Sequence, residues 1–197
     1  ALSREPSCIH RRRVVELGCG CGLAGLFCAG LGAEAVLLTD WDENALAFAK
    51  ENLALNMQGP GSALIPASTR VDFGRLAWGE AAEAPENVLC AATAADLVLG
   101  CDICYDSRHP LLVAETIRHR CHNAKRFFLS FQVRHKASTN EEDALLKELS
   151  DLLSGDGWVL DAVESRLFDR PLAPETLFDF DSEAKHIEVN VIRLSRD

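Results

Sequence analysis

The chain has 197 residues, of which 48% are hydrophobic and 25% charged, and its formal net charge is −10 at pH 7. This length fits one domain with a full apolar core, and the composition is that of an ordinary globular protein. So acidic a chain is a poor candidate for binding nucleic acid, because duplexes require a basic surface that replaces counterions. The charge suits a basic partner such as a lysine-bearing protein, although a solvated acidic surface has the same balance.

Membrane and secretory classes are also disfavoured. No apolar run reaches the roughly 18 residues of a membrane span, and no apolar segment of a signal peptide follows the first residues. The eight cysteines lie mostly in apolar stretches, where a free thiol behaves as a small hydrophobe. We therefore expect reduced thiols, a monomer, and a cytoplasmic location with the nucleus as an alternative.

The first predicted elements are a strand over residues 14–17, a glycine-rich turn, and a helix over residues 23–31. Glycines allow positive φ and let a ligand come close to the main chain. The start of the helix leaves unpaired N–H groups and a positive dipole end facing that ligand. This stretch predicts a nucleotide-type cofactor site. The helix is apolar on nearly every side, so we expect it to be well buried.

The elements that follow alternate between strands and helices. We predict strands over residues 35–39, within 64–71, and over 96–100, 126–132, 158–163 and 186–194, and helices over 42–56, over 110–120 and after capping boxes at 138–142. Residues 80–94 are predicted to be a surface connection that is partly helical. The pattern predicts a Rossmann-like, doubly wound α/β sheet, mostly parallel, with an antiparallel last strand.

Two interpretations of the glycine turn compete. Gly20-Cys-Gly22-Leu-Ala-Gly25 matches the dinucleotide pattern G-x-G-x-x-G, and Asp40 lies where a ribose-binding acid is expected. The alternative is an S-adenosylmethionine site, whose core is Glu16-Leu-Gly18-Cys-Gly20-Cys-Gly22. The turn alone does not separate them.

Three residues favour S-adenosylmethionine. Its ammonium needs negative or carbonyl partners, and Glu16 would help to supply that field. Asp40 would accept both ribose hydroxyls, and Trp78 would stack on the adenine. Each has a structural alternative: Glu16 as a surface charge, Asp40 as a helix cap, and Trp78 as an ordinary core or loop residue.

Together these motifs resemble methyltransferase-like family 16. The resemblance rests on the stretches at residues 14–25, Leu-Leu-Thr-Asp40, Asn52-Leu-Ala-Leu-Asn56, Leu76-Ala-Trp78-Gly79 and Asp96-Leu-Val-Leu-Gly-Cys-Asp102-Ile-Cys-Tyr105-Asp. Family members are class I, seven-strand S-adenosylmethionine-dependent methyltransferases, and most characterised ones methylate lysines of particular proteins. The resemblance implies that fold and that activity for this chain.

The resemblance also implies which residues form the site. It places cofactor contacts at Gly18, Cys19, Gly20, Asp40, Trp78 and Cys101. Asp102 and Tyr105 match the family's Asp-x-x-Tyr motif. We hypothesise that Asp102 draws in and orients a lysine head group, while the Tyr105 hydroxyl bonds to the amine or shapes its channel. The alternative is that Asp102 only caps its loop or packs against the cofactor.

The chain differs from family members ahead of its first strand. Family members carry a segment ahead of the first strand, with an aromatic residue near the methionine end of the cofactor, whereas only residues 1–12 precede the first strand here. We therefore expect a single methyltransferase domain over residues 1–197 whose N-terminal segment is truncated.

Several alternatives stay open. The pairs Cys19/Cys21 and Cys101/Cys104 follow neighbouring strands; we interpret them as packing residues and expect no metal, with oxidation sensitivity or a zinc site as alternatives. The acidic stretch over residues 168–183 is either a dock for a basic partner or a surface loop. For the function, the alternatives are methylation of a small molecule or of histidine, a non-catalytic binding module, and an NAD-dependent oxidoreductase.

Overall fold

The computed structural model describes residues 6–57, 64–79, 83–133, 139–169 and 186–197. Its centre is a seven-stranded sheet with the strand order β3-β2-β1-β4-β5-β7-β6. The strands are β1 (Arg13–Leu17), β2 (Ala35–Asp40), β3 (Arg70–Arg75), β4 (Leu97–Cys101), β5 (Arg126–Val133), β6 (Val159–Asp169) and β7 (His186–Ser195). The sheet is parallel from β3 to β5, and β7 runs antiparallel to both of its neighbours. The predicted fold class is confirmed.

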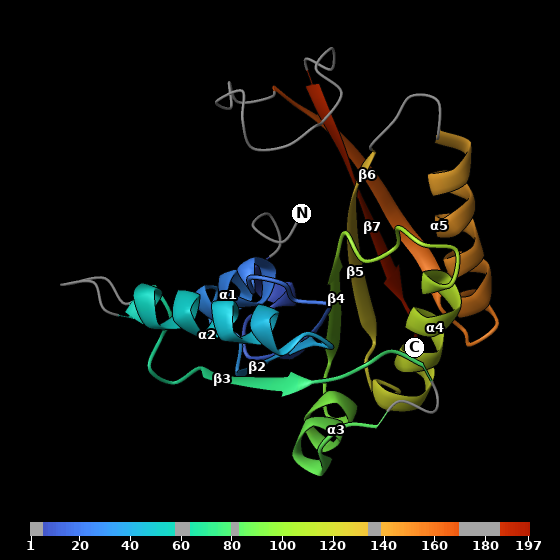
Figure 1. The fold of residues 1–197 in the computed structure, drawn as a ribbon. Coiled ribbons are helices and arrows are strands. Elements are labelled where there is room, and N and C mark those ends of the chain that lie inside the picture. Colours follow the sequence, from blue (N-terminus) through green and yellow to red (C-terminus); the bar gives the residue numbers. More distant parts are fainter. Residues whose placement is uncertain (1–5, 58–63, 80–82, 134–138, 170–185) are drawn as a thin grey trace.

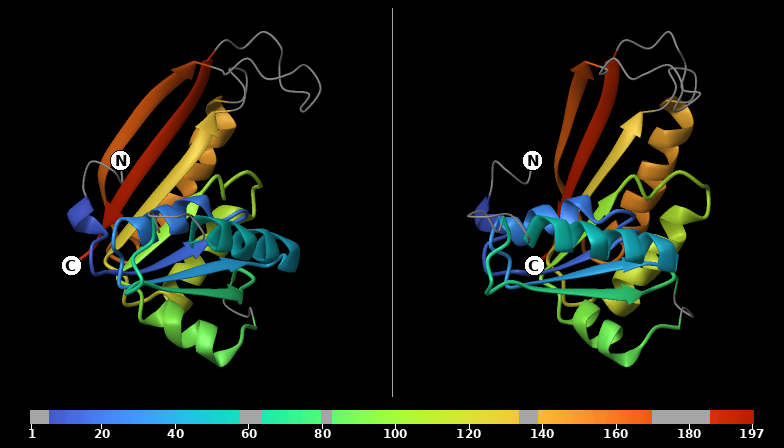
Figure 2. Two further views of the ribbon diagram at one scale, coloured as in Figure 1. Left: turned by 90° about the vertical axis from the view of Figure 1, so that its left-hand side faces the viewer. Right: turned by 60° about the vertical axis from the view of Figure 1, so that its left-hand side comes forward.

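Helices cover both faces of the sheet. They are α1 (Leu23–Gly30), α2 (Glu43–Met57), α3 (Glu86–Thr93), α4 (His109–Arg120) and α5 (Thr139–Ser154), preceded by the short 3-10 turn η2 (Pro6–Cys8). Figures 1 and 2 show α1 and α2 together on one side, with α4 and α5 on the other. Two apolar cores result: Leu26, Ala29 and Leu38 belong to the first, and Val113, Ile117 and Phe127 to the second.

Most predicted elements are confirmed to within a residue or two, but the third strand is placed wrongly. It spans Arg70–Arg75 rather than residues 64–71. A turn at Pro66 precedes it, in which the Thr69 N–H donates to the Pro66 carbonyl at 2.9 Å. Ile65, which looked like a strand residue, is instead only 3% exposed and belongs to the core beneath α1.

Helix α1 is less buried than its composition predicts. Its inner residues Leu26 and Ala29 are buried, whereas Leu23 and Phe27 are 76% and 45% exposed. The helix packs against the sheet on one face only, and its outer face borders a groove of about 540 Å³ that it shares with α2 and Leu64. The expectation of an all-round buried helix was therefore wrong, because no second layer covers α1 within the described part of the chain.

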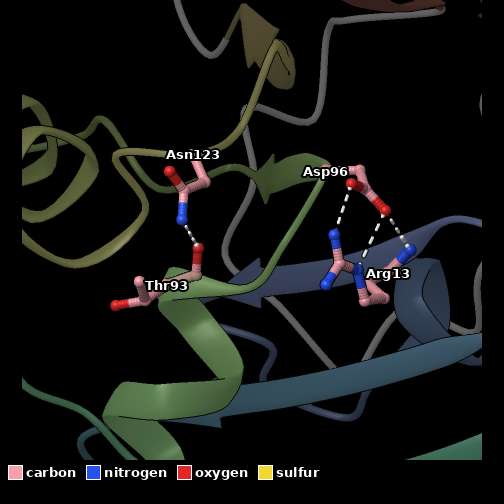
Figure 3. A network of polar contacts seen from close by, with 4 residues as sticks. All are labelled: Arg13, Thr93, Asp96 and Asn123. Carbon is pink, nitrogen blue, oxygen red and sulfur yellow. Dashed lines mark hydrogen bonds and ion pairs between the residues drawn. The ribbon is translucent and has the colours of Figure 1, made fainter.

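The amino-terminal edge of the sheet is held by a charged clamp between β1 and the start of β4 (Figure 3). The Arg13 guanidinium donates to both carboxylate oxygens of Asp96, at 2.9 and 3.2 Å, and the Arg13 backbone N–H donates to the same carboxylate at 2.9 Å. These bonds to Arg13 lower the pKa of Asp96. Nearby, the Asn123 amide donates to the Thr93 carbonyl at 2.9 Å and ties the loop before β5 to α3.

The described helices include none that is both long and apolar enough to cross a bilayer. The acidic stretch at 168–183 lies mostly outside the described residues, as do the side chains of the predicted capping boxes at 138–142.

We predict that Asp96→Asn lowers the free energy of unfolding by about 1 kcal/mol at neutral pH, because the charged fork is partly exposed and screened. The folded-state pKa of Asp96 is lowered, so its contribution is present above the ordinary carboxyl pKa and is lost as the pH falls through the folded-state value. Urea unfolding from pH 3 to 7 measures this.

Asp72→Asn is the matched control, because the Arg70–Asp72 pair is a single contact whose side chains are 68% and 44% exposed. It should change stability by less than about 0.5 kcal/mol. Equal effects of the two substitutions would show that the clamp contributes no more than a surface pair.

Candidate functional site

The glycine loop joins the end of β1 to α1 at the carboxyl edge of the sheet. Gly18 and Gly20 both have left-handed φ, +63° and +52°. A Cβ on Gly18 would lie 2.9 Å from an indole carbon of Trp78, so this position is filled by the protein itself. Around Gly20, by contrast, no described heavy atom lies within 4 Å of where a Cβ would stand. The loop therefore offers a ligand an open approach to its main chain at Gly20.

The Asp40 carboxylate holds this loop in place from the end of β2. One oxygen accepts the Gly20 N–H at 2.9 Å, and the other accepts the Asp42 N–H at 3.0 Å. Asp40 is 8% exposed. A carboxylate has about four acceptor positions, so lone pairs remain for hydroxyl groups of a ligand. Asp40 thus does more than start α2, and it places a negative charge beside the open face of Gly20.

Glu16 lies under the loop rather than at its surface. It is 1% exposed, and its Oε2 accepts the N–H of Gly25, in the first turn of α1, at 2.8 Å. Burial raises the pKa of Glu16 to about 8, and the nearby charge of Asp40 adds to the rise while the Gly25 bond opposes it. The surface-charge alternative is thereby wrong. That Glu16 contributes to the negative field around the ammonium of a bound cofactor stays a prediction.

An aromatic row connects the third and fourth strands at this edge. The rings of Trp78 and His109 meet edge to face with centroids 5.4 Å apart, and those of His109 and Tyr105 with centroids 4.5 Å apart. The Tyr105 N–H also faces His109 Nδ1 at 3.5 Å. Sequence reasoning assigned no role to His109. Its place four residues after Tyr105, directly before the proline of a helix start, was the available signal.

Asp102 follows β4 in a left-handed conformation, with φ at +57°. Its N–H donates to the Ser130 carbonyl at 2.6 Å, which fixes the turn at the end of the strand. The next side chain, Ile103, is 2% exposed and fills the space between Gly18 and Gly100. Tyr105 is 62% exposed. A left-handed non-glycine residue held by its neighbours is typical of functional loops.

The structure therefore brings the predicted residues to one edge. Register pairs Leu17 of β1 with Thr39 of β2 and with Gly100 of β4, so the loops after the three strands are neighbours. Trp41 is a further residue at this edge that sequence reasoning missed. It follows Asp40 directly and is 69% exposed. Ligands of open α/β sheets bind at this carboxyl edge.

The two members of each cysteine pair differ in exposure. Cys19 and Cys104 are buried, whereas Cys21 and Cys101 are exposed, and all eight cysteines of the chain are free. Burial raises the pKa of both Cys19 and Cys104 to about 12, which leaves them as neutral packing groups. Among the residues that the structure describes, no group of three or more His, Cys, Asp or Glu side chains is placed to hold a metal ion.

A family described as lysine methyltransferase matches residues 3–152 of the chain. The chain belongs to this family. The protein N-lysine methyltransferase METTL21A of Danio rerio is 34% identical over 145 residues, which cover 73% of this chain and 58% of that protein. The EEF1A lysine methyltransferase 3 of Xenopus tropicalis is 30% identical over 130 residues, covering 65% and 50%.

The chain thus spans about half the length of these curated relatives. Solved structures support the fold. Magnesium protoporphyrin IX methyltransferase from Synechocystis, with bound SAH, matches 100% of this chain and 78% of that chain with a TM-score of 0.60 at 14% identity. A putative RNA methyltransferase from Pyrococcus horikoshii matches 99% and 80%, with a TM-score of 0.58 at 16% identity. The architecture is that of the methyltransferases.

We predict that Glu16→Gln removes a pH dependence from folding stability. Between about pH 4.5 and 8 the unfolded chain loses the Glu16 proton while the folded chain keeps it, so stability falls with rising pH. Glutamine stays neutral and still accepts the Gly25 N–H. The variant should gain on the wild type by up to about 1.4 kcal/mol per pH unit across this window.

Urea unfolding at several pH values measures the difference between the two proteins. A difference in unfolding free energy that is the same at every pH reflects the extra amide protons of glutamine and does not bear on the pKa of Glu16. A difference that does not change between pH 4.5 and 8 would contradict a proton-holding Glu16.

Proposed function

We propose that the chain is an S-adenosylmethionine-dependent methyltransferase that acts on a lysine side chain of a protein substrate. The carrying observation is the open main chain at Gly20 beside the Asp40 carboxylate, with Asp102 and Tyr105 at the same edge. Membership of the lysine methyltransferase family and the names of the relatives support this assignment.

The residues at the edge suit S-adenosylmethionine. The remaining acceptor positions of Asp40 suit the two ribose hydroxyls, and the open backbone at Gly20, which follows Gly18 and Cys19 in the loop, suits the amino-acid end. We assign Trp78 as an aromatic wall for adenine and Cys101, exposed at the end of β4, as a further cofactor contact. When bound, this cofactor supplies a methyl group activated by a sulfonium.

The substrate side is carried by Asp102 and Tyr105. A lysine amine has an unperturbed pKa of about 10.4, so it arrives protonated and must be held while it loses its proton to solvent. The Asp102 carboxylate attracts and orients the ammonium, and the exposed Tyr105 hydroxyl bonds to the amine once it is neutral. A nucleophile held in line reacts faster because its orientation is already fixed.

We further propose a single domain over residues 1–197 and a monomer in the cytoplasm or nucleus. The single sheet with helices on both faces supports one domain, and the eight free cysteines support a reducing compartment. The net charge of −10 supports a basic protein partner rather than nucleic acid.

We predict that Asp40→Ala weakens binding of S-adenosylmethionine at least tenfold, or about 1.4 kcal/mol, because the ribose acceptor and the anchor of the Gly20 loop are both lost. Calorimetric titration measures the affinity. Asp42→Ala is the matched control, because Asp42 only caps α2 by accepting the Asn44 N–H at 2.9 Å. It should bind the cofactor like the wild type despite a cost of about 1 kcal/mol in stability.

If both variants bind alike, Asp40 is merely a structural cap. The same titration with NAD tests the dinucleotide alternative: affinity for NAD without affinity for S-adenosylmethionine would overturn the proposed function.

We predict that Asp102→Asn lowers methyl transfer at least tenfold while leaving cofactor affinity within about twofold. Asparagine tolerates the left-handed backbone at this position, so the loop should keep its shape. Tritiated methyl incorporation into a cell lysate, followed by acid hydrolysis to identify the methylated amino acid, is the measurement.

Asp106→Asn is the control, because Asp106 lies in the same loop but pairs with the exposed Arg108 at 2.9 Å. It should label the lysate like the wild type. Label on methyl-histidine or on small molecules would replace the lysine assignment, and full activity of Asp102→Asn would remove Asp102 from the mechanism.

A further inference from the structure

His109 contacts both sides of the candidate site. Its ring meets Trp78, on the cofactor side, and Tyr105, on the substrate side, in two edge-to-face contacts with centroids 5.4 and 4.5 Å away. The near approach of the Tyr105 N–H to Nδ1, at 3.5 Å, adds a polar contact to the same loop. The His109 ring therefore lies between the residue assigned to the cofactor side and the residue assigned to the substrate side.

The imidazole is carried on a rigid element. His109 is the first residue of α4, where its N–H donates to the Asp106 carbonyl at 2.9 Å and Pro110 follows it in the first turn. Val113, Ala114 and Ile117 of α4 are fully buried. The backbone of His109 is therefore held by α4, whereas the Tyr105 side chain that its ring meets is 62% exposed.

Trp78 is fixed on its other side. Its indole lies against Gly18, where a Cβ would stand only 2.9 Å from an indole carbon. The following residue is also anchored, since the Gly79 N–H donates to Thr116 Oγ1 of α4 at 2.9 Å. A change in the position of Tyr105 can therefore be transmitted to Trp78 through the ring of His109.

We propose that His109 is a positioning residue that couples the cofactor wall to the substrate loop. Ordering of Tyr105 orders His109 and through it Trp78, so that each side binds more tightly when the other is set. This inference rests on the proposed function, which places cofactor at Trp78 and lysine at Tyr105. By linkage the coupling acts equally in both directions.

A double-mutant cycle on cofactor affinity tests the coupling without any protein substrate. The probe is S-adenosylhomocysteine, titrated calorimetrically into the wild type, Tyr105→Ala, His109→Ala and the double variant. We expect Tyr105→Ala to weaken binding about three- to tenfold when His109 is present and by less than about 1.5-fold in the His109→Ala background. Additive effects of the two substitutions would overturn the proposal.

Two conservative variants separate the contacts and also serve if His109→Ala fails to fold. His109→Phe keeps both ring contacts and loses the Nδ1 acceptor, and His109→Asn keeps an acceptor and loses the ring. A coupling carried by the rings predicts that His109→Phe retains the effect of Tyr105→Ala on affinity and that His109→Asn loses it. A merely structural role would lower the melting temperature of both variants and leave that effect unchanged in both.

The failures of the two proposals are distinguishable. If S-adenosylhomocysteine binds with additive effects while lysine in the lysate is methylated, the coupling fails and the proposed function stands. If the cycle shows coupling but no lysine is labelled, the lysine assignment fails and the role of His109 stands. A wild type that does not bind the probe overturns both.

Discussion

The site depends on one carboxylate that accepts two backbone N–H groups. Asp40 ends β2, holds the Gly20 N–H on one oxygen and the Asp42 N–H on the other, and so joins strand, glycine loop and α2 at one point. Parallel pairing of β2 with β1 brings the loop within reach of that carboxylate. The backbone at Gly20 is held in its open position because the Asp40 carboxylate accepts the Gly20 N–H.

Two acidic residues near this loop behave differently because their surroundings differ. Asp40 accepts bonds from two N–H groups and keeps an edge toward solvent. Glu16 lies under the loop with one N–H partner, and burial raises its pKa to about 8. The fold thereby places one hydrogen-bonded carboxyl group at the ligand side and one buried carboxyl group, whose pKa is raised, underneath. A pair of like charges in so small a space would otherwise repel.

The sequence allowed the sheet and the edge at which the candidate residues lie to be predicted, because glycine spacing and apolar runs are local signals. The placement of β3 was wrong because Ile65 joins the core with α1, which is distant in sequence, and the chain turns at Pro66 before the strand begins. His109 was missed for a similar reason. Its two ring contacts join loops after β3 and β4, and no spacing rule relates Trp78 to Tyr105.

The unequal exposure of the thiols has a practical consequence. Cys21, Cys90 and Cys101 are exposed, while the other five are buried. An alkylating probe can reach these three positions in the folded chain, but Cys101, at the end of β4 beside the candidate site, should react more slowly because burial raises its pKa. Cys90 lies on α3, away from the glycine loop, so a label there provides an internal reference. A spectroscopic label on Cys101 would thus report changes at the carboxyl edge of the sheet, and a label on Cys90 would give the reference signal.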